Sequence, residues 1–324
     1  MRWRRSSKVV LAATVAAASA LLVGAGCGAS SKTGDAPSNT VLQSRSAGWH
    51  RAASMSQRRS YIAGAQIGPL VYAAGGMVGE TGRPLATFSR YDTRRDQWTQ
   101  LPQLPVATRA AAAAALDGTI YVTGGTTPAG NTAAVWAWDG TRWRARAPLP
   151  RAVFNHSAVV VDGKLYVAGG YSGLRERREV YVYDPAANNW TLATELPRPT
   201  HAFGAVAFRG ELWTIGGRRG ETILREVRIW SPRTGRWRRG PTLPKPMELL
   251  GAAVAGDEIH AVWESTYQVW DASDGRWRQG PGLGVPRHGL ELFAAGGELY
   301  AVGGCTTDLH DSPIVERIAI DRSA

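Results

Sequence analysis

The sequence predicts an all-β fold, a closed β-propeller of six blades. Two series of residues carry this prediction, and both recur along the chain about every 45 residues. The first is a short apolar run that ends in two glycines, such as residues 165–170, and the second is a single tryptophan. Each tryptophan lies 27 positions before the second residue of the next glycine pair. Repeats of this length, built of short strands without helical periodicity, are typical of propeller blades.

Each glycine pair is predicted to end a buried strand. β-Branched and aromatic residues precede the pair, and glycine suits a strand end where φ is positive or another backbone approaches closely. Five copies keep both glycines, whereas the fifth copy in chain order has lost them. The six copies end at Gly75-Gly76, Gly124-Gly125, Gly169-Gly170, Gly216-Gly217, Trp263-Glu264 and Gly303-Gly304.

The tryptophan series has companions at fixed distances. An aromatic residue lies seven positions before each tryptophan from the second onward, and a Leu-Pro pair begins six positions after four of them. The tryptophans are Trp49, Trp98, Trp143, Trp190, Trp237 and Trp277, and the aromatic residues are Tyr91, Trp136, Tyr183, Trp230 and Trp270. With the double glycine, this pattern resembles the kelch repeat over about residues 48–321. The resemblance implies that the first strand of each blade lines a central channel, the glycine-pair strand is second, the aromatic strand is third and the tryptophan strand is outermost.

The two ends of the repeat array complement each other. Trp49 precedes every glycine pair, whereas the last pair is followed only by the strand-like run at residues 315–318, without a further tryptophan. We therefore expect the segment around Trp49 to supply the outer strand of the sixth blade. Closure of this kind leaves no open sheet edge between the first and last blades.

The first 26 residues are predicted to be a secretory signal. Four basic residues precede an uncharged apolar stretch, residues 9–23, which is too short for a comfortable membrane span. Small residues then lead to Cys27, an arrangement that resembles the lipobox of bacterial lipoproteins, in which this cysteine is lipidated; Gly24 departs from the usual leucine or valine. Residues 28–47 are rich in Ser, Gly and Ala and predict a flexible linker. We expect an exported protein anchored to the membrane by lipid, with simple cleavage or an uncleaved anchor as the alternatives.

The charge of the chain favours acidic partners. The formal net charge is +12, and it stays at about +8 once the four basic residues of the signal are removed. A basic domain outside the cytoplasm suits an anionic glycan or an acidic protein segment of the cell envelope, although a basic surface also simply aids solubility. We see no motif that reads nucleic acid, and we expect a monomer that binds none.

The candidate site is predicted at one end of the propeller. The segment between a glycine pair and the next tryptophan varies from 22 to 13 residues, and in a kelch blade its loops emerge beside the Leu-Pro loops. Variable loops on a fixed scaffold commonly bind ligands. We call this end the mouth face. The residues eleven positions after each tryptophan, which we expect to ring the channel there, are Ser60, Arg109, Phe154, His201, Glu248 and His288.

Two functions fit the polar residues of the mouth face. The predicted ligand-binding residues are Arg109, Arg151, His156, His201, Arg218, Glu248, Arg287 and His288. In the first reading the protein binds an anionic ligand or protein partner through arginine hydrogen bonds and has no catalytic residue. In the second, the protein resembles the sialic-acid mutarotases among exported bacterial kelch propellers and would be a sugar-acid mutarotase or epimerase. This resemblance implies that Glu248 and His201 transfer protons. Arg109 or Arg287 would then hold the carboxylate of the substrate. The scattered histidines form no metal-binding motif, and we expect no metal and no cofactor. Polarity that serves only the structure is the third possibility for these residues.

Overall fold

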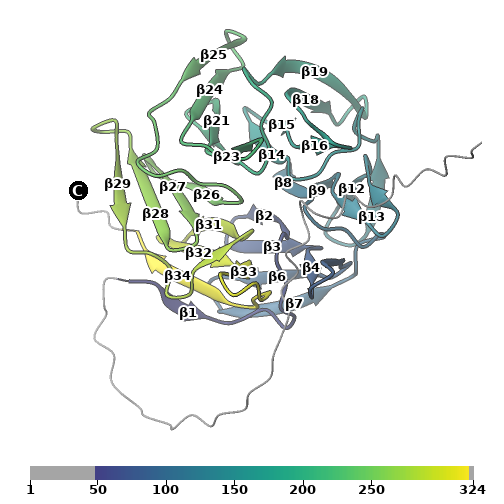
Figure 1. Ribbon diagram of the computed structural model, residues 1–324. Coiled ribbons are helices and arrows are strands. Elements are labelled where there is room, and N and C mark those ends of the chain that lie inside the picture. Colours follow the sequence, from purple (N-terminus) through teal and green to yellow (C-terminus); the bar gives the residue numbers. More distant parts are fainter. Residues whose placement is uncertain (1–47, 321–324) are drawn as a thin grey trace, which may run out of the picture.

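The computed structural model describes residues 48–320, and it confirms the all-β, six-bladed propeller. Six four-stranded antiparallel sheets surround a central channel, and the chain passes once around the ring (Figure 1). Residues 48–320 contain no helix, and so none that is long and apolar enough to cross a bilayer. The expected signal peptide (residues 1–26), lipidated Cys27 and linker (residues 28–47) lie outside the described residues, as does residue 321.

The strands of the first five blades run outward from the channel in chain order. The first blade comprises β2 (Ala63–Ile67), β3 (Leu70–Ala74), β6 (Phe88–Asp92) and β7 (Gln97–Leu101). The second comprises β8 (Ala112–Leu116), β9 (Thr119–Thr123), β12 (Val135–Trp138) and β13 (Trp143–Arg146). The third comprises β14 (Ser157–Val161), β15 (Lys164–Ala168), β18 (Glu179–Asp184) and β19 (Asn189–Glu195). The fourth comprises β20 (Gly204–Phe208), β21 (Glu211–Ile215), β24 (Val227–Ser231) and β25 (Arg236–Arg239). The fifth comprises β26 (Gly251–Ala255), β27 (Glu258–Trp263), β28 (Thr266–Asp271) and β29 (Arg276–Gly280).

The sixth blade joins the two ends of the chain, as predicted. Its strands from the channel outward are β31 (Glu291–Ala295), β32 (Glu298–Val302), β34 (Val315–Ala319) and β1 (His50–Ala52). In Figure 1 the purple β1 lies along the yellow β34, and the two strands pair antiparallel with Arg51 opposite Glu316. The propeller is therefore closed by strand pairing between residues far apart in the sequence.

The variable segments form small hairpins that the sequence pattern did not predict. In the first four blades, a two-stranded hairpin follows the glycine pair directly. The pairs are β4 (Met77–Val78) with β5 (Arg83–Pro84), β10 (Thr126–Thr127) with β11 (Gly130–Asn131), β16 (Tyr171–Ser172) with β17 (Arg175–Glu176), and β22 (Arg218–Arg219) with β23 (Thr222–Ile223). In the sixth blade, β33 (Cys305–Thr306) pairs instead with β30 (Arg287–His288).

The tryptophan period follows from hydrogen bonds between neighbouring blades. Five of the six indoles donate from Nε1 to a backbone carbonyl of the preceding blade or the loop that leaves it, as Trp190 does to Ala147 at 2.9 Å. The exception is Trp237, which donates to the hydroxyl of Thr194 at 3.2 Å. Because each outer strand has its tryptophan, the same contact ties the periphery of every pair of blades together.

One aromatic residue of the predicted register is placed differently. In four blades, the residue seven positions before the tryptophan lies directly opposite it on the neighbouring strand, as with Tyr183 and Trp190. In the second blade, Trp138 and not Trp136 lies opposite Trp143, with ring centroids 5.4 Å apart. All five connections contain four residues, but Trp143 is the first residue of its strand, whereas the other four tryptophans are the second, so its partner lies five and not seven positions before it.

The apolar core consists of six clusters, one at each interface between neighbouring blades. Between the first two blades, for example, Phe88 packs against Trp138 and Trp143 at centroid distances of 5.4 and 4.8 Å. Aromatic side chains bury large apolar areas in such contacts. Each blade therefore depends on both neighbours for its stability, and ring closure supplies the sixth interface.

The glycine pairs allow a further contact between blades. The second residue of each pair donates its N–H to the carbonyl of the residue ten positions after the next tryptophan, as Gly76 does to Thr108 at 2.9 Å. Gly76 has a φ of 100°, and a Cβ there would lie 2.8 Å from the carbonyl oxygen of Ser60. The degenerate fifth copy keeps the contact, because Glu264 adopts a φ of 51° and donates to Arg287 at 2.7 Å. A side chain thus occupies a left-handed position that glycine fills in the other five blades.

Candidate functional site

A closed ring of backbone hydrogen bonds surrounds the channel at the mouth face. The residue twelve positions after each tryptophan donates its N–H to the carbonyl of the corresponding residue in the preceding blade, with N···O distances of 2.7 to 3.1 Å. All six residues have φ values between 46° and 59°, although five of them are not glycine. The ring residues are Tyr61, Ala110, Asn155, Ala202, Leu249 and Gly289. Each residue predicted to line the mouth directly precedes one of these ring residues in the sequence. The ring therefore fixes the backbone beside every predicted mouth position.

Tyr61 is the one ring residue with an ionisable side chain, and other mouth residues gather around it. Its ring meets that of His288 edge-on, with centroids 6.3 Å apart. Burial and, to a lesser extent, the charge of Glu248 raise the pKa of Tyr61 to about 12, against a lowering effect of Arg109 and Arg218. Charged side chains from several blades therefore lie near one phenol, and two of them, Arg218 and Glu248, are in direct contact.

Arg109 is a half-buried cation of the mouth without a carboxylate partner. Its guanidinium lies against the β4–β5 hairpin, where Nη1 is 3.4 Å from Met77 Sδ and is packed beside Gly82. Among residues 48–320, no carboxylate oxygen lies within 4.0 Å of its nitrogens, and burial lowers the pKa of Arg109. A half-buried guanidinium without a counter-charge favours an anionic ligand group.

Glu248 and His201 both lie at the mouth, and each has an ionisable side chain beside it. Arg218 Nε lies 2.6 Å from Glu248 Oε2. His201 Nδ1 lies 3.3 Å from Glu176 Oε1, and its ring stands edge-on to Tyr171 with centroids 4.5 Å apart. Burial lowers the pKa of His201 to about 4, and the Arg218 charge contributes to that shift, so the imidazole is neutral at pH 7.

Besides Glu176, two further acidic residues of the mouth were missed by sequence reasoning. Glu264 Oε1 lies 3.8 Å from His288 Nδ1, and burial together with the charge of Glu248 raises the pKa of Glu264. Asp311 accepts hydrogen bonds from the Ser60 hydroxyl at 2.6 Å and the Gly79 N–H at 2.7 Å, and burial raises its pKa. For Glu264 a signal existed, because it replaces a glycine of the repeat. Asp311 lies in a segment of no fixed register, and nothing in the pattern marked it.

Three predicted ligand-binding residues do not join this group. His156 is buried against the second blade, with Nε2 2.9 Å from Thr123 Oγ1, and burial lowers its pKa to about 4. Arg151 lies at the third blade, where its Nε is 4.0 Å from a Glu179 carboxylate. Arg287 is fully buried and donates from Nη1 to Glu316 at 2.6 Å.

Most other arginines of the mouth face also have acidic partners. Arg178 pairs with Glu195 at 3.0 Å, and Arg219 pairs with Glu226 at 3.2 Å. The expected Arg-rich face is thus partly neutralised within the protein, and Arg109 differs from the remaining exposed cations in being half-buried. Among residues 48–320, no three His, Cys, Asp or Glu side chains are grouped to hold a metal ion.

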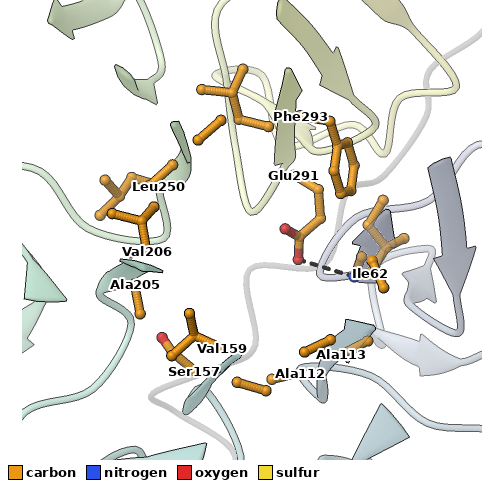
Figure 2. Close-up of a pocket in the computed structure, with 18 of the residues that line it drawn as sticks. Ile62, Ala112, Ala113, Ser157, Val159, Ala205, Val206, Leu250, Glu291 and Phe293 are labelled. Atoms are coloured by element: carbon orange, nitrogen blue, oxygen red, sulfur yellow. Dashed lines mark hydrogen bonds between the residues drawn. The ribbon is translucent and has the colours of Figure 1, made fainter. Parts of the chain in front are cut away.

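Below the ring, the channel itself forms a cavity of about 470 Å³. Small and apolar residues of the six inner strands line it, and Figure 2 shows Glu291 pointing into it from β31. Of the eight predicted ligand-binding residues, His156 alone belongs to its lining. The mouth and the channel are therefore two chemically distinct candidate sites.

Comparison with known proteins supports the fold and the repeat. The Kelch repeat and BTB domain-containing protein F47D12.7 of Caenorhabditis elegans is 35% identical over 82 residues, which are 24% of this chain and 14% of that protein. Kelch-like protein 34 of Homo sapiens is 36% identical over 78 residues, 24% of this chain and 12% of that protein. The chain therefore matches about one seventh of the length of these curated relatives or less.

A solved structure and a family description agree with this result. The structure titled "Structure of YjhT" superimposes with a TM-score of 0.74 at 17% identity, over 84% of this chain and 98% of that one, which shows a common fold. The KLHDC2/KLHL20/DRC7 Kelch-repeats domain matches residues 61–262. Because this match covers more than half of the chain, the protein belongs to the family of the KLHDC2/KLHL20/DRC7 Kelch-repeats domain.

Proposed function

We propose that this protein is a binding protein whose mouth face holds an anionic glycan, with Arg109 as the anchor for the acidic group. The observation that carries the proposal is the unpaired, half-buried guanidinium of Arg109 beside Tyr61. A carboxylate ligand would supply the missing counter-charge through charge-assisted hydrogen bonds.

The rest of the mouth suits the uncharged part of a sugar acid. Glu248, Glu264 and Asp311 are acceptors for sugar hydroxyls, and the rings of Tyr61 and Tyr171 offer apolar faces. The same carboxylates disfavour ligands with several negative charges, because like charges repel at close range. The proposed ligand therefore has one acidic group and several hydroxyls.

Binding of sugar acids by an Arg109→Met variant tests this function. N-acetylneuraminate and glucuronate, with glucose as the neutral control, would be titrated calorimetrically at low and moderate salt. Loss of a charge-assisted hydrogen bond costs about 1.5–3 kcal/mol, so we expect the Kd of the acids to rise roughly 10- to 150-fold. Arg151→Met is the matched control, since this arginine lies on the same face, away from the mouth group.

Three results would contradict the proposal: equal binding of glucose, unchanged affinity in Arg109→Met, or an equal loss in Arg151→Met. If the sugars do not bind but an acidic peptide does, and this binding requires Arg109, then Arg109 is the anion-binding residue but the ligand is a peptide and not a glycan.

A second candidate function is mutarotation or epimerisation of a sugar acid at the same mouth. It is favoured by two neighbouring carboxyl groups in different environments, since Glu248 is paired with Arg218 whereas burial raises the pKa of Glu264. Such a pair supplies a base and an acid, and the neutral imidazole of His201 lies close to Arg218. If the protein is an enzyme, it should accelerate anomer exchange followed by NMR, and Glu248→Gln should return the rate to the uncatalysed one. A wild-type rate equal to the uncatalysed rate excludes this function.

We also propose that the propeller is exported and held at the outer side of a membrane by lipid on Cys27. The motif that ends at Cys27, with the apolar stretch before it, supports this proposal. Fatty-acid labelling of the expressed protein should be lost in Cys27→Ser, and labelling that persists in this variant would refute lipidation at Cys27.

A further inference from the structure

The central channel contains one charged side chain in a lining that is otherwise uncharged. The cavity of about 470 Å³ lies within the range of roughly 300–1,000 Å³ that small-molecule sites occupy. Alanine, valine, leucine and glycine of the six inner strands make up most of its wall, and neither lysine nor arginine belongs to it. Glu291 is the exception, and its carboxyl group points toward the middle of the channel (Figure 2).

Glu291 departs from the six-fold pattern of the inner strands. It lies fourteen positions after its tryptophan, at the start of β31. The residues at the same position of the other five blades are all small, namely Ala63, Ala112, Ser157, Gly204 and Gly251. A glutamate here is thus specific to the sixth blade and is not required by the fold.

The neighbouring strand is shaped to receive this side chain. A Cβ on Gly64 of β2 would lie 2.6 Å from Glu291 Cγ, so any larger residue there would collide with it. The N–H of Gly64 donates to Glu291 Oε1 at 3.3 Å, and the ring of Phe293 also packs over this glycine. Gly64 and Glu291 therefore form a matched pair that holds one carboxylate oxygen and leaves the other toward the cavity.

We propose that the channel binds a small organic cation, a protonated amine with a short apolar body, whose ammonium group pairs with the carboxylate of Glu291. A buried carboxylate without a counter-charge is costly, and a cationic ligand removes that cost. The alanine and valine side chains of the wall would contact the apolar body of the amine. This site is separate from the anion site at the mouth, and neither depends on the other.

The ionisation of Glu291 makes this binding depend on pH. Burial raises the pKa of Glu291 to about 8, against a lesser, lowering effect of the Gly64 hydrogen bond. The other titratable residues of the cavity lining are Tyr61 and His156; burial raises the pKa of Tyr61 to about 12 and lowers that of His156 to about 4, so both are neutral at pH 7 to 9. No charge of the wall competes with the ligand over this range. Binding of an ammonium ion near pH 7 must therefore displace a proton from Glu291.

The test uses three probes of similar size and different charge. Butylammonium, butanol and butyrate would be titrated into the full-length protein in detergent, by calorimetry at pH 7 and pH 9. Alkylammonium groups stay protonated at both values, because their pKa is roughly that of lysine, about 10.4. We expect butylammonium alone to bind measurably, about tenfold more tightly at pH 9, and to release about one proton per site at pH 7 as the ionised fraction of Glu291 rises.

Two variants locate the binding. Glu291→Gln keeps the shape of the side chain without its charge, and it should lose butylammonium binding, the pH dependence and the proton release. Glu248→Gln removes a carboxylate of the mouth and should bind the amine as the wild type does. Near-ultraviolet circular dichroism of Glu291→Gln establishes that its channel is folded, and unchanged glucuronate binding would show that its mouth is intact.

The inference fails if butylammonium binds Glu291→Gln as tightly as the wild type, if butanol binds equally well, or if no amine binds at pH 9. A loss in Glu248→Gln but not in Glu291→Gln would place the amine at the mouth and overturn the channel site. None of these outcomes decides whether Arg109 holds a sugar acid.

Discussion

Replacement of Arg287 by methionine should destabilise the propeller strongly without altering the ligand affinity of the folded protein. The side chain of Arg287 is 0% exposed and that of its partner Glu316 is 3% exposed, with Nη1 and Oε2 2.6 Å apart. Arg287 also donates to the carbonyls of Gly303 at 2.8 Å and Val285 at 2.9 Å. Arg59, likewise ten positions after its tryptophan, is buried in the same way and donates to Gly75 at 3.0 Å.

The expected magnitude follows from what the substitution leaves behind. In Arg287→Met, the carboxylate of Glu316 keeps only a weak contact, the Val285 N–H at 3.4 Å, and carbonyl acceptors lose their donor. Breaking a buried ion pair from one side costs about 3–5 kcal/mol. For a domain of this size, that corresponds to a fall in Tm of roughly 10 °C.

Urea unfolding of a double-mutant cycle measures the coupling directly. Arg287→Met and Glu316→Gln would be compared with the double variant, which buries no charge and should be more stable than the sum of the two single losses implies. This prediction is contradicted if the free energy of unfolding of Arg287→Met stays within about 1 kcal/mol of the wild type, or if the two single losses simply add. In either case the buried ion pair does not stabilise the propeller. A reduced sugar-acid affinity of the folded variant would instead return Arg287 to the ligand site.

Two further predictions concern the channel and the closure. Because burial raises the pKa of Glu291 to about 8, the protonated carboxyl is the form favoured in the folded protein; its contribution to stability is present below the unfolded pKa of about 4.5 and is lost as the pH rises through 8, by at most about 1.4 kcal/mol per pH unit. Thermal unfolding should thus show Glu291→Gln gaining on the wild type at pH 9 but not at pH 4, and a constant difference would contradict the assignment. At the closure, Trp49→Phe loses the bond from Nε1 to Pro281 at 2.7 Å and should cost about 1 kcal/mol, with faster amide exchange in β1 and β34; unchanged exchange there would show that the indole does not secure the closing strand.

The fold could be predicted because its requirements recur six times. In each blade a tryptophan must donate a hydrogen bond to the preceding blade, and a glycine pair must let a backbone N–H reach the next one. These two requirements place the same residue types at constant spacing along the sequence. Even the degenerate copy obeys the geometry, since Glu264 keeps the hydrogen bond of the missing glycine. The single misplaced aromatic, Trp136, occurs in the blade whose tryptophan lies one position earlier in its strand, so that the seven-residue spacing no longer matches the strand pairing.

The candidate site could be predicted in position but only partly in composition. Adjacent residues of an extended segment point to opposite sides, so His288 lies at the mouth while Arg287, one position earlier, is buried. The repeat register placed the arginine and histidine candidates together on the mouth face. The structure separates them by pairing most arginines with carboxylates of other segments, such as Glu195 of β19 and Glu316 of β34. Such pairings depend on the fold of each loop, and the repeat holds no information about them.

The backbone ring at the mouth gives the protein a frame that is independent of its side chains. All six N–H groups point in the same rotational direction, and every donor and acceptor in the circle is satisfied by another member. Proline is barred from these positions, since it has neither the N–H nor the positive φ, and β-branched residues are disfavoured there. Tyr61, Ala110, Asn155 and Leu249 show how freely the identity varies. Substitutions at these positions can therefore change the ligand specificity of the mouth while the ring of backbone hydrogen bonds stays intact. A new ligand can then be bound without a change in the packing of the blades.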